Sequence, residues 1–538
     1  MQCLLDLIHC PNESMASYVA VAIQFLVSNS IVCKFIVNET SLHRIMSLAN
    51  SEIIDYQRTA SSSFASFSLT EDTKMCIVRE GALSQIMMLG KCDEIETRRN
   101  IVFCIANLSD SPELQVDIVK EGGISLLLDA GSCHDSSILR DISRAFSSLS
   151  TTSIGKEEII CSESIKLLFN LARSEDLATQ RYCALSICNV CSGGNKEPLV
   201  SRDALKTILF LMKYPDFDTE RLASLAIASL SLGDKLSIRQ NVLREGFIQI
   251  LVEKLKFPEV EIQRCAAIAL NAIVLNNNNV AKAEIMNIDG LPIILSLAES
   301  EDQEFAHVMI YLLGSLAENE EVKANLVELN SISLFVRKAY SSLVELKRAT
   351  AYFLMLLASS VEFHDKLADN GGMEALIRLA SFSDLECQEY AAFSLAFMAS
   401  NRDYQVKLVK LGAVRPLVSM MAANDESKHY AGLALLKLAD NFENHIAIAE
   451  EGGIQALLQM GRSQITDEEL QYKAALTVGH LASNAVELLP KDGKNRIGIG
   501  FAAETLQKRR IKKMMKKRTT KLISDSIEKV GETYSGLK

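Results

Sequence analysis

A sequence pattern returns about every 41 residues along most of this 538-residue chain. A short step that ends in glycine, such as Glu121-Gly122 or Glu451-Gly452, precedes an apolar stretch, and a longer amphipathic stretch follows. The longer stretch carries a Leu-x-x-Leu-like pattern, which gives one equivalent position per unit. We name these the ruler positions: Phe25, Ser66, Asn107, Ser148, Asn189, Ser229, Ala272, Ser315, Leu356, Phe397, Lys437 and His480. About twelve such units cover residues 1 to about 490, which predicts a repeat protein.

The composition favours helices within each unit. Only 8 prolines and 25 glycines interrupt the chain, hydrophobic residues make up 48% of it, and Trp is absent. A chain rich in Leu, Ile, Ala and Val and poor in Pro is typical of stacked helices. Because one unit cannot bury its apolar face alone, neighbouring units are expected to share a continuous core. The sequence therefore predicts an all-α solenoid over residues 1–495, followed by a basic, helical tail over residues 496–538.

The unit resembles the armadillo repeat, on segments such as Val119-Lys120-Glu121-Gly122-Gly123-Ile124 and Ala106-Asn107-Leu108-Ser109. This resemblance implies a short first helix, a turn near the glycine and two longer helices, wound into a right-handed superhelix whose third helices line a concave groove. Among armadillo proteins the sequence is similar to vacuolar-protein-8-like and to plant or protist scaffolds. Met1 falls inside a second helix of the pattern, so we expect a partner or preceding chain to cover that end.

A ladder of basic residues stands eight positions before the ruler positions. Residues at these two positions lie near one stripe of a helix, so the arginines are expected to line the groove and to bind carboxylates or backbone carbonyls of a partner. Acids three residues earlier offer a structural alternative. Arginine at this position also resembles the armadillo consensus, which implies a bridge between adjacent repeats. The ladder consists of Arg58, Arg99, Arg140, Arg181, Arg221, Arg264 and, after His307, Arg348.

Aromatic and asparagine residues occupy two further positions of the same stripe. Tyr311, Tyr352 and Phe393 lie four residues before the ruler, and Phe397 lies on it. They are candidate anchors for a partner, with burial in the core as the alternative. Asn107 and Asn189 are the only ruler asparagines. Importin-α-like proteins pair such asparagines with tryptophans, and this chain has no Trp, so the sequence argues against binding of nuclear-localisation peptides.

The charge is divided between the body and the tail. Residues 494–538 carry thirteen Lys or Arg against four Asp or Glu, although the whole chain has a net charge of −11. Ile511, Met515, Leu522 and Ile523 could share one face of a basic amphipathic helix. Packing on the acidic body, a calmodulin-like target, an acidic protein or membrane surface and a nuclear-localisation signal remain open; among functional roles we favour an acidic protein surface such as tubulin tails. Its central basic residues are Lys508, Arg509, Arg510, Lys512, Lys513, Lys516, Lys517 and Arg518.

No motif for catalysis or for a cofactor is recognisable. The chain lacks a phosphate-binding loop, a nucleophile elbow and metal-ligand spacing among its eight His, so we predict neither enzyme activity nor a cofactor. Cys188-x-x-Cys191 is a lone pair that reads as core packing. An acidic body opposes nucleic-acid binding. Scattered cysteines, the lack of a signal sequence and the lack of an 18-residue apolar run predict a cytoplasmic protein without a transmembrane segment.

These observations predict a non-catalytic scaffold or adaptor that binds extended or helical partner segments in its groove. By fold-level analogy it suits a structural part of a cytoskeletal or ciliary assembly. The alternatives are an importin-like transport adaptor and a membrane-associated armadillo organiser. The second of these lacks an N-terminal Met-Gly for myristoylation, although Cys3 and Cys10 could in principle be acylated.

Overall fold

A computed structural model describes residues 39–462, apart from short gaps at 162, 233–235, 276–277 and 422–424, together with a few residues between 18 and 26 and between 474 and 481. Within these residues every regular element is a helix and no strand occurs. The chain forms two units, one ending at Phe247 and the other beginning at Ile248. The all-α solenoid predicted from the repeat pattern is confirmed.

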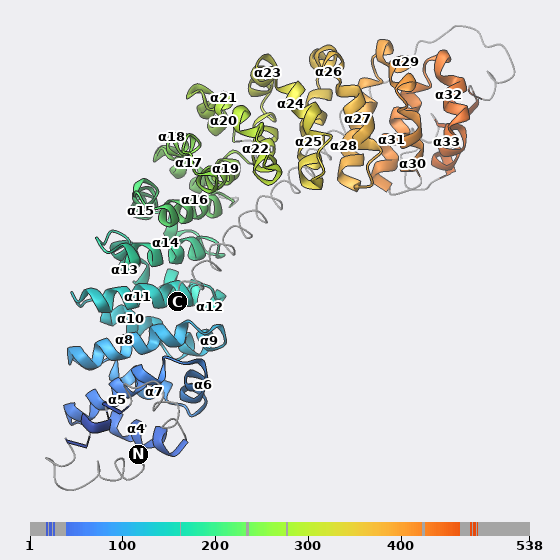
Figure 1. Cartoon of the computed structure of the whole chain (residues 1–538). Helices are drawn as coiled ribbons and strands as arrows, with labels where there is room; N and C mark the ends of the chain where they lie inside the picture. Colours follow the sequence, from blue (N-terminus) through green and yellow to red (C-terminus); the bar gives the residue numbers. More distant parts are fainter. Residues whose placement is uncertain are drawn as a thin grey trace. The chain divides into compact units, whose positions relative to one another are not determined.

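The first unit is a stack of helical repeats (Figure 1). Its helices are α4 (Glu39–Ala49), α5 (Ile54–Phe67), α6 (Glu71–Arg79), α7 (Leu83–Leu89), α8 (Ile95–Ser109), α9 (Pro112–Lys120), α10 (Gly123–Ala130), α11 (Ser136–Leu149), α12 (Ser153–Cys161), α13 (Ser164–Leu171), α14 (Leu177–Cys191), the 3₁₀ turn η1 (Pro198–Val200), α15 (Arg202–Lys213), α16 (Phe217–Ser231) and α17 (Leu236–Arg244), with the start of α18 (Phe247–Lys254).

The second unit continues the same order of helices. It comprises α19 (Val260–Val274), α20 (Asn279–Asn287), α21 (Gly290–Ala298), α22 (Gln303–Leu316), α23 (Glu320–Glu328), α24 (Ser331–Lys338), α25 (Val344–Ala358), η2 (Val361–Phe363), α26 (His364–Asp369), α27 (Gly372–Ala380), α28 (Leu385–Met398), α29 (Arg402–Lys410), α30 (Val414–Met421), α31 (Asp425–Leu438), η3 (Phe442–Asn444), α32 (His445–Glu450) and α33 (Gly453–Arg462).

The third helix of each repeat carries the ruler position. The ten ruler positions from Ser66 to Lys437 all lie in α5, α8, α11, α14, α16, α19, α22, α25, α28 and α31. Within each unit these helices pack successively on one another. Third helices have 14 or 15 residues, whereas second helices such as α7 and α10 have only 7 and 8. The expectation of two longer helices per repeat is therefore wrong for most of the described repeats, since α15, with 12 residues, and α4, with 11, are the only described second helices that approach a third helix in length.

Burial explains why the third helices are the long ones. In α14 all residues from Cys183 to Cys191 are buried, because this segment is covered by neighbouring third helices on both sides and by the shorter helices behind it. Burying a Leu or Ile side chain contributes roughly 1.5–3 kcal/mol. The Cys188 and Cys191 thiols belong to this core, and burial raises the pKa of Cys191 to about 12, as expected of packing rather than redox chemistry.

The glycine step is a left-handed turn between the first and second helices. Gly122 has φ +87° between α9 and α10, and Gly81, Gly246, Gly371, Gly412 and Gly452 also have positive φ. In two repeats the same turn is made by Asp289 and Asn330, with φ of 53° and 57°. The turn residue at the Asp289-Gly290 step is therefore the aspartate, not the glycine that the pattern selects. Asp and Asn are the side chains that best tolerate this conformation.

Replacing Gly122 by Ala is expected to destabilise the first unit by roughly 1–2 kcal/mol, because an L-residue is strained at this φ. No atom lies within 4 Å of the added Cβ at Gly122, and the same holds at Gly194, which does not have a positive φ. Gly194→Ala is thus a matched control with little expected change. The measurement is the urea midpoint of both variants, and equal midpoints would contradict a conformational role for Gly122.

Candidate partner-binding surface

The arginine ladder forms clamps between successive repeats. Arg140 is the fifth residue of α11, and its Nε and Nη2 atoms lie 2.9 and 2.7 Å from the two carboxylate oxygens of Asp176, the residue that caps α14. The other clamps of this kind are Arg58–Glu94, Arg99–Asp135, Arg181–Asp216 and Arg348–Asp384. Each arginine therefore holds the beginning of the next third helix.

Each capping carboxylate of these clamps makes two interactions: it accepts a backbone hydrogen bond in its own helix and it pairs with the arginine of the preceding repeat. Asp176 accepts a hydrogen bond from the backbone N–H of Thr179 at 3.0 Å while it pairs with Arg140. Asp216 accepts from the Thr219 N–H at 3.1 Å and pairs with Arg181. The first turn of a helix has backbone donors without intrahelical acceptors. One side chain thus completes the helix start and orients the guanidinium of the preceding repeat.

The remaining ladder positions either add further partners to this arrangement or lack it. Arg221 pairs with Asp218 in its own helix at 3.3 Å. Arg264 lies 3.4 Å from Asp302, the cap of α22, and so keeps the clamp, but it also lies within 3.5 Å of Glu261 and Glu304. Where His307 takes the ladder position, the cap of the next third helix is Leu343, with no carboxylate. At this junction both members of the clamp are therefore replaced, the arginine by His307 and the carboxylate by Leu343.

The structural alternative for the ladder thus has direct support, and the exposure of its arginine side chains varies from 11% for Arg221 to 52% for Arg140. The Arg99 and Arg140 side chains remain 44% and 52% exposed although both are paired. A guanidinium has five N–H donors, and the clamp of Arg140 uses two of its nitrogens. The remaining donors stay available for a partner, so the predicted groove role of the arginines stays a prediction.

The two ruler asparagines hydrogen-bond to neighbouring repeats. Asn107 Nδ2 donates to Ser68 Oγ at 2.9 Å, and Asn107 Oδ1 accepts from Arg144 at 2.7 Å. Asn189 Nδ2 donates to Ser150 Oγ at 3.1 Å. Both side chains are buried. They therefore connect third helices to one another, which leaves them poorly placed to hold a peptide.

Three of the four predicted aromatic anchors are buried. Tyr311 and Tyr352 are 1% exposed and Phe393 is 5% exposed, whereas Phe397 is partly exposed. The Tyr352 ring lies 5.6 Å from that of Tyr390, and Phe393 lies 5.3 Å from Tyr430. Their position faces the adjacent third helix, so the core alternative applies to these three rings, and only Phe397 offers a reachable surface.

The capping carboxylates are the residues that the sequence patterns did not single out. They stand thirteen positions before the ruler, as Glu94, Asp135, Asp176, Asp216, Asp302 and Asp384. A search at that offset would have found them, and an acid followed by the first residue of a helix is the usual signature of a cap. The basic tail residues from Lys508 to Arg518 lie outside the described residues.

The clamp makes stability sensitive to acid. The hydrogen bonds donated by Arg140, with those from Thr179, outweigh burial and lower the pKa of Asp176 to about 2; in an unfolded chain it titrates near pKa ~3.9. A lowered pKa stabilises the fold above pH ~4, and this contribution is lost as pH falls towards about 2. Asp176→Asn should be less stable at pH 7 and lose less stability between pH 4 and 2. Parallel urea titrations at each pH test this, and identical pH slopes would contradict it.

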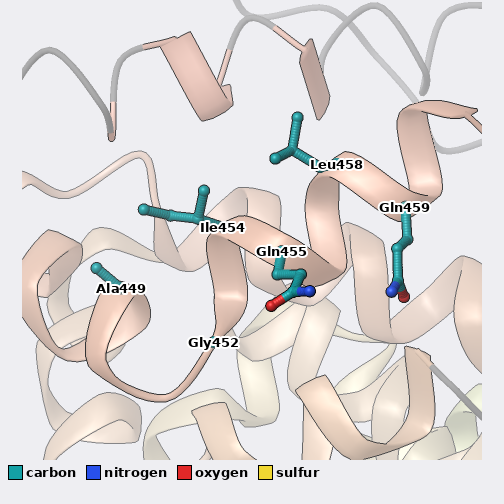
Figure 2. A pocket seen from close by; sticks show the side chains of 6 residues that line it. All are labelled: Ala449, Gly452, Ile454, Gln455, Leu458 and Gln459. Atoms are coloured by element: carbon teal, nitrogen blue, oxygen red, sulfur yellow. The ribbon is translucent and has the colours of Figure 1, made fainter.

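Other kinds of site find little support in the described part of the chain. No group of three or more His, Cys, Asp or Glu there could hold a metal ion. None of the described helices has the length and apolar character required to traverse a bilayer. A hollow of about 510 Å³ lies between α32 and α33 (Figure 2), lined by Ala449, Gly452, Ile454, Gln455, Leu458 and Gln459. These side chains include no acid, base or nucleophile.

Solved structures resemble this arrangement of helices. A structure from work on a phosphorylation switch in the interaction of cadherin with β-catenin superimposes with a TM-score of 0.68 at 14% identity, covering 90% of this chain and 99% of that one. The fold is a helical-repeat solenoid. An engineered protein superimposes with a TM-score of 0.54 at 22% identity, covering 83% and 99% of the two chains. No protein-family model and no curated protein matches the sequence.

These similarities concern the fold. At such low identity a shared solenoid does not imply a shared partner. The similarities agree with the helical-repeat fold that the resemblance implies, while the narrower similarity to vacuolar-protein-8-like scaffolds stays a prediction.

Proposed function

We propose that this chain is a non-catalytic scaffold that binds extended or helical segments of other proteins along its third helices. The observation that carries the proposal is the pair Arg99 and Arg140, whose guanidinium groups are held by Asp135 and Asp176 yet remain 44% and 52% exposed. A donor whose orientation is already fixed loses less entropy on binding. Arginine in a fixed orientation suits carboxylates and backbone carbonyls of a partner segment.

The finer parts of the proposal concern the cellular assembly and the basic tail. A role in a cytoskeletal or ciliary assembly follows by analogy from a long solenoid with few loops. Acidic partners such as tubulin tails are proposed for the basic tail, since thirteen Lys or Arg lie within residues 494–538. An importin-like role is disfavoured because Asn107 and Asn189 are occupied between repeats.

The test is cross-linking mass spectrometry on the full chain purified at low salt with its partners. Partner peptides are expected on the third helices of the first unit, and Arg99→Gln combined with Arg140→Gln should reduce partner retention by about tenfold. Neutral glutamine avoids bringing a new carboxylate against the capping aspartates.

Arg79→Gln combined with Arg173→Gln is the matched control, because both arginines are exposed and lie on α6 and after α13, off the third helices. Circular dichroism must show that both double variants are folded. Partner cross-links confined to first helices, or equal retention by both variants, would overturn the proposal.

A further inference from the structure

A row of exposed apolar side chains marks the first residue of the third helices in the first unit. Ile54, Ile95, Leu177 and Phe217 begin α5, α8, α14 and α16 and are 53%, 43%, 39% and 41% exposed. The remaining member, Ser136 of α11, is polar. We name these five positions the N1 row. Nothing in helix formation requires an apolar residue at this place, and aligned exposed apolar residues mark an interaction surface.

The surroundings of the N1 row are acidic. Counting from two residues before each cap to the fifth helical residue, the five helix starts carry eleven Asp or Glu and six Arg. Arg58 is shared among Asp55, Glu94 and Glu96, and the carboxylates of Asp55 and Glu96 stay 53% exposed. An apolar row with an excess of carboxylates fits a segment that is both apolar and basic.

The chain contains one segment with this chemistry outside the described residues. Residues 506–530 carry ten Lys or Arg and two acids, and Ile511, Met515 and Leu522 share one face at helical spacing. As a helix this segment would be ~36 Å long, and five stacked helices at 8–10 Å separation span roughly 32–40 Å. The 43 residues from 463 to 505, which connect α33 to this segment, could reach roughly 140 Å when extended.

We propose that residues 506–530 bind the N1 row of the same chain as a basic amphipathic helix. Ile511, Met515 and Leu522 contact the apolar residues, and the flanking lysines and arginines pair with the exposed carboxylates. Binding of this kind keeps the tail from acidic partners until salt or a competing surface releases it. It goes beyond the scaffold function, which concerns partners on the arginine ladder.

The test is zero-length carbodiimide cross-linking of the full-length chain, which joins lysine amines to carboxylates in direct contact. At 50 mM salt we expect links from Lys508, Lys512 or Lys516 to Asp55, Glu96 or Glu175. Ile95→Ser with Leu177→Ser and Phe217→Ser should reduce these links by about tenfold, and 500 mM salt should reduce them severalfold, because screening weakens exposed ion pairs.

Matched controls separate the row from general surface hydrophobicity. Met88→Ser with Ile154→Ser removes apolar side chains that are 44% and 40% exposed on α7 and α12, and it should leave the links unchanged. Mixing ¹⁴N- and ¹⁵N-labelled chains distinguishes links within a chain from links between copies. Tail links between differently labelled chains, tail links to other helices, or links insensitive to the triple variant would each overturn the proposal.

Discussion

Replacing Glu318 by Ala should destabilise the second unit by about 3–5 kcal/mol, the largest effect that we expect from any single change. Glu318 Oε2 lies 2.9 Å from the Nζ atom of Lys282, whose side chain is 0% exposed. Glu318 Oε1 accepts a hydrogen bond from Tyr352 at 2.9 Å. Removal of the carboxylate strips a fully buried ammonium of its ion pair and a buried hydroxyl of its acceptor.

The size of this destabilisation follows from the buried Lys282 charge that remains after the Glu318 carboxylate is removed. Burial of a charge is tolerated when a partner compensates it, and the cost appears when one partner is deleted. The double change Lys282→Met with Glu318→Leu should recover most of the loss, since neither charge remains. Tyr352→Phe should cost only about 1 kcal/mol, the usual net value of a hydrogen bond.

Hydrogen exchange over α20 to α25, together with urea unfolding, measures the effect of the Glu318 change locally and globally. A repeat protein can unfold in parts, so the local readout is needed. If the single and double variants were equally unstable, the buried charge would not be the cause.

The second large effect is expected for Asp216→Ala in the first unit, at about 2–3 kcal/mol. Asp216 caps α16 through the Thr219 N–H and accepts hydrogen bonds from Arg181, and its side chain is 8% exposed. Loss of a cap costs roughly 0.5–2 kcal/mol. The remaining destabilisation comes from loss of the ion pair with Arg181. This loss is moderate because the Arg181 side chain is 34% exposed and water can hydrate it.

A double-mutant cycle with Arg181→Met isolates the clamp from the cap. Asp216→Asn keeps a capping oxygen and should lose only about 1 kcal/mol. Asp203→Ala, an exposed acid in the first turn of α15, is the control and should stay within about 0.5 kcal/mol. Additive effects of the Asp216 and Arg181 changes would show that the clamp does not couple the two repeats.

The fold could be predicted from the sequence because the same pattern recurs in every repeat. Ten ruler positions repeat one helical pattern, so an error in any single repeat would not have changed the prediction. The length of individual helices was less accessible: η1 replaces a first α-helix before α15, since propensity is a weak guide where tertiary packing decides.

The site was less predictable because residues that share one stripe of a helix in the sequence pattern can be exposed or buried in the folded protein. Arg140 and Tyr311 share a sequence-derived stripe, yet the arginine is 52% exposed and the tyrosine 1%. Neighbouring helices cover one edge of that stripe and not the other. The partner of Arg140 lies 36 residues away, so only a comparison of offsets between repeats could have paired it with Asp176.

The two members of each clamp always stand in the same order along the chain. In each of them the arginine belongs to the earlier repeat, and the carboxylate belongs to the helix start of the later one. A ribosome releases the N-terminal repeats first. Within the first unit, each finished repeat therefore presents a guanidinium to the next third helix as it emerges. In that unit, each new third helix from α8 to α16 thus begins against a surface that is already folded.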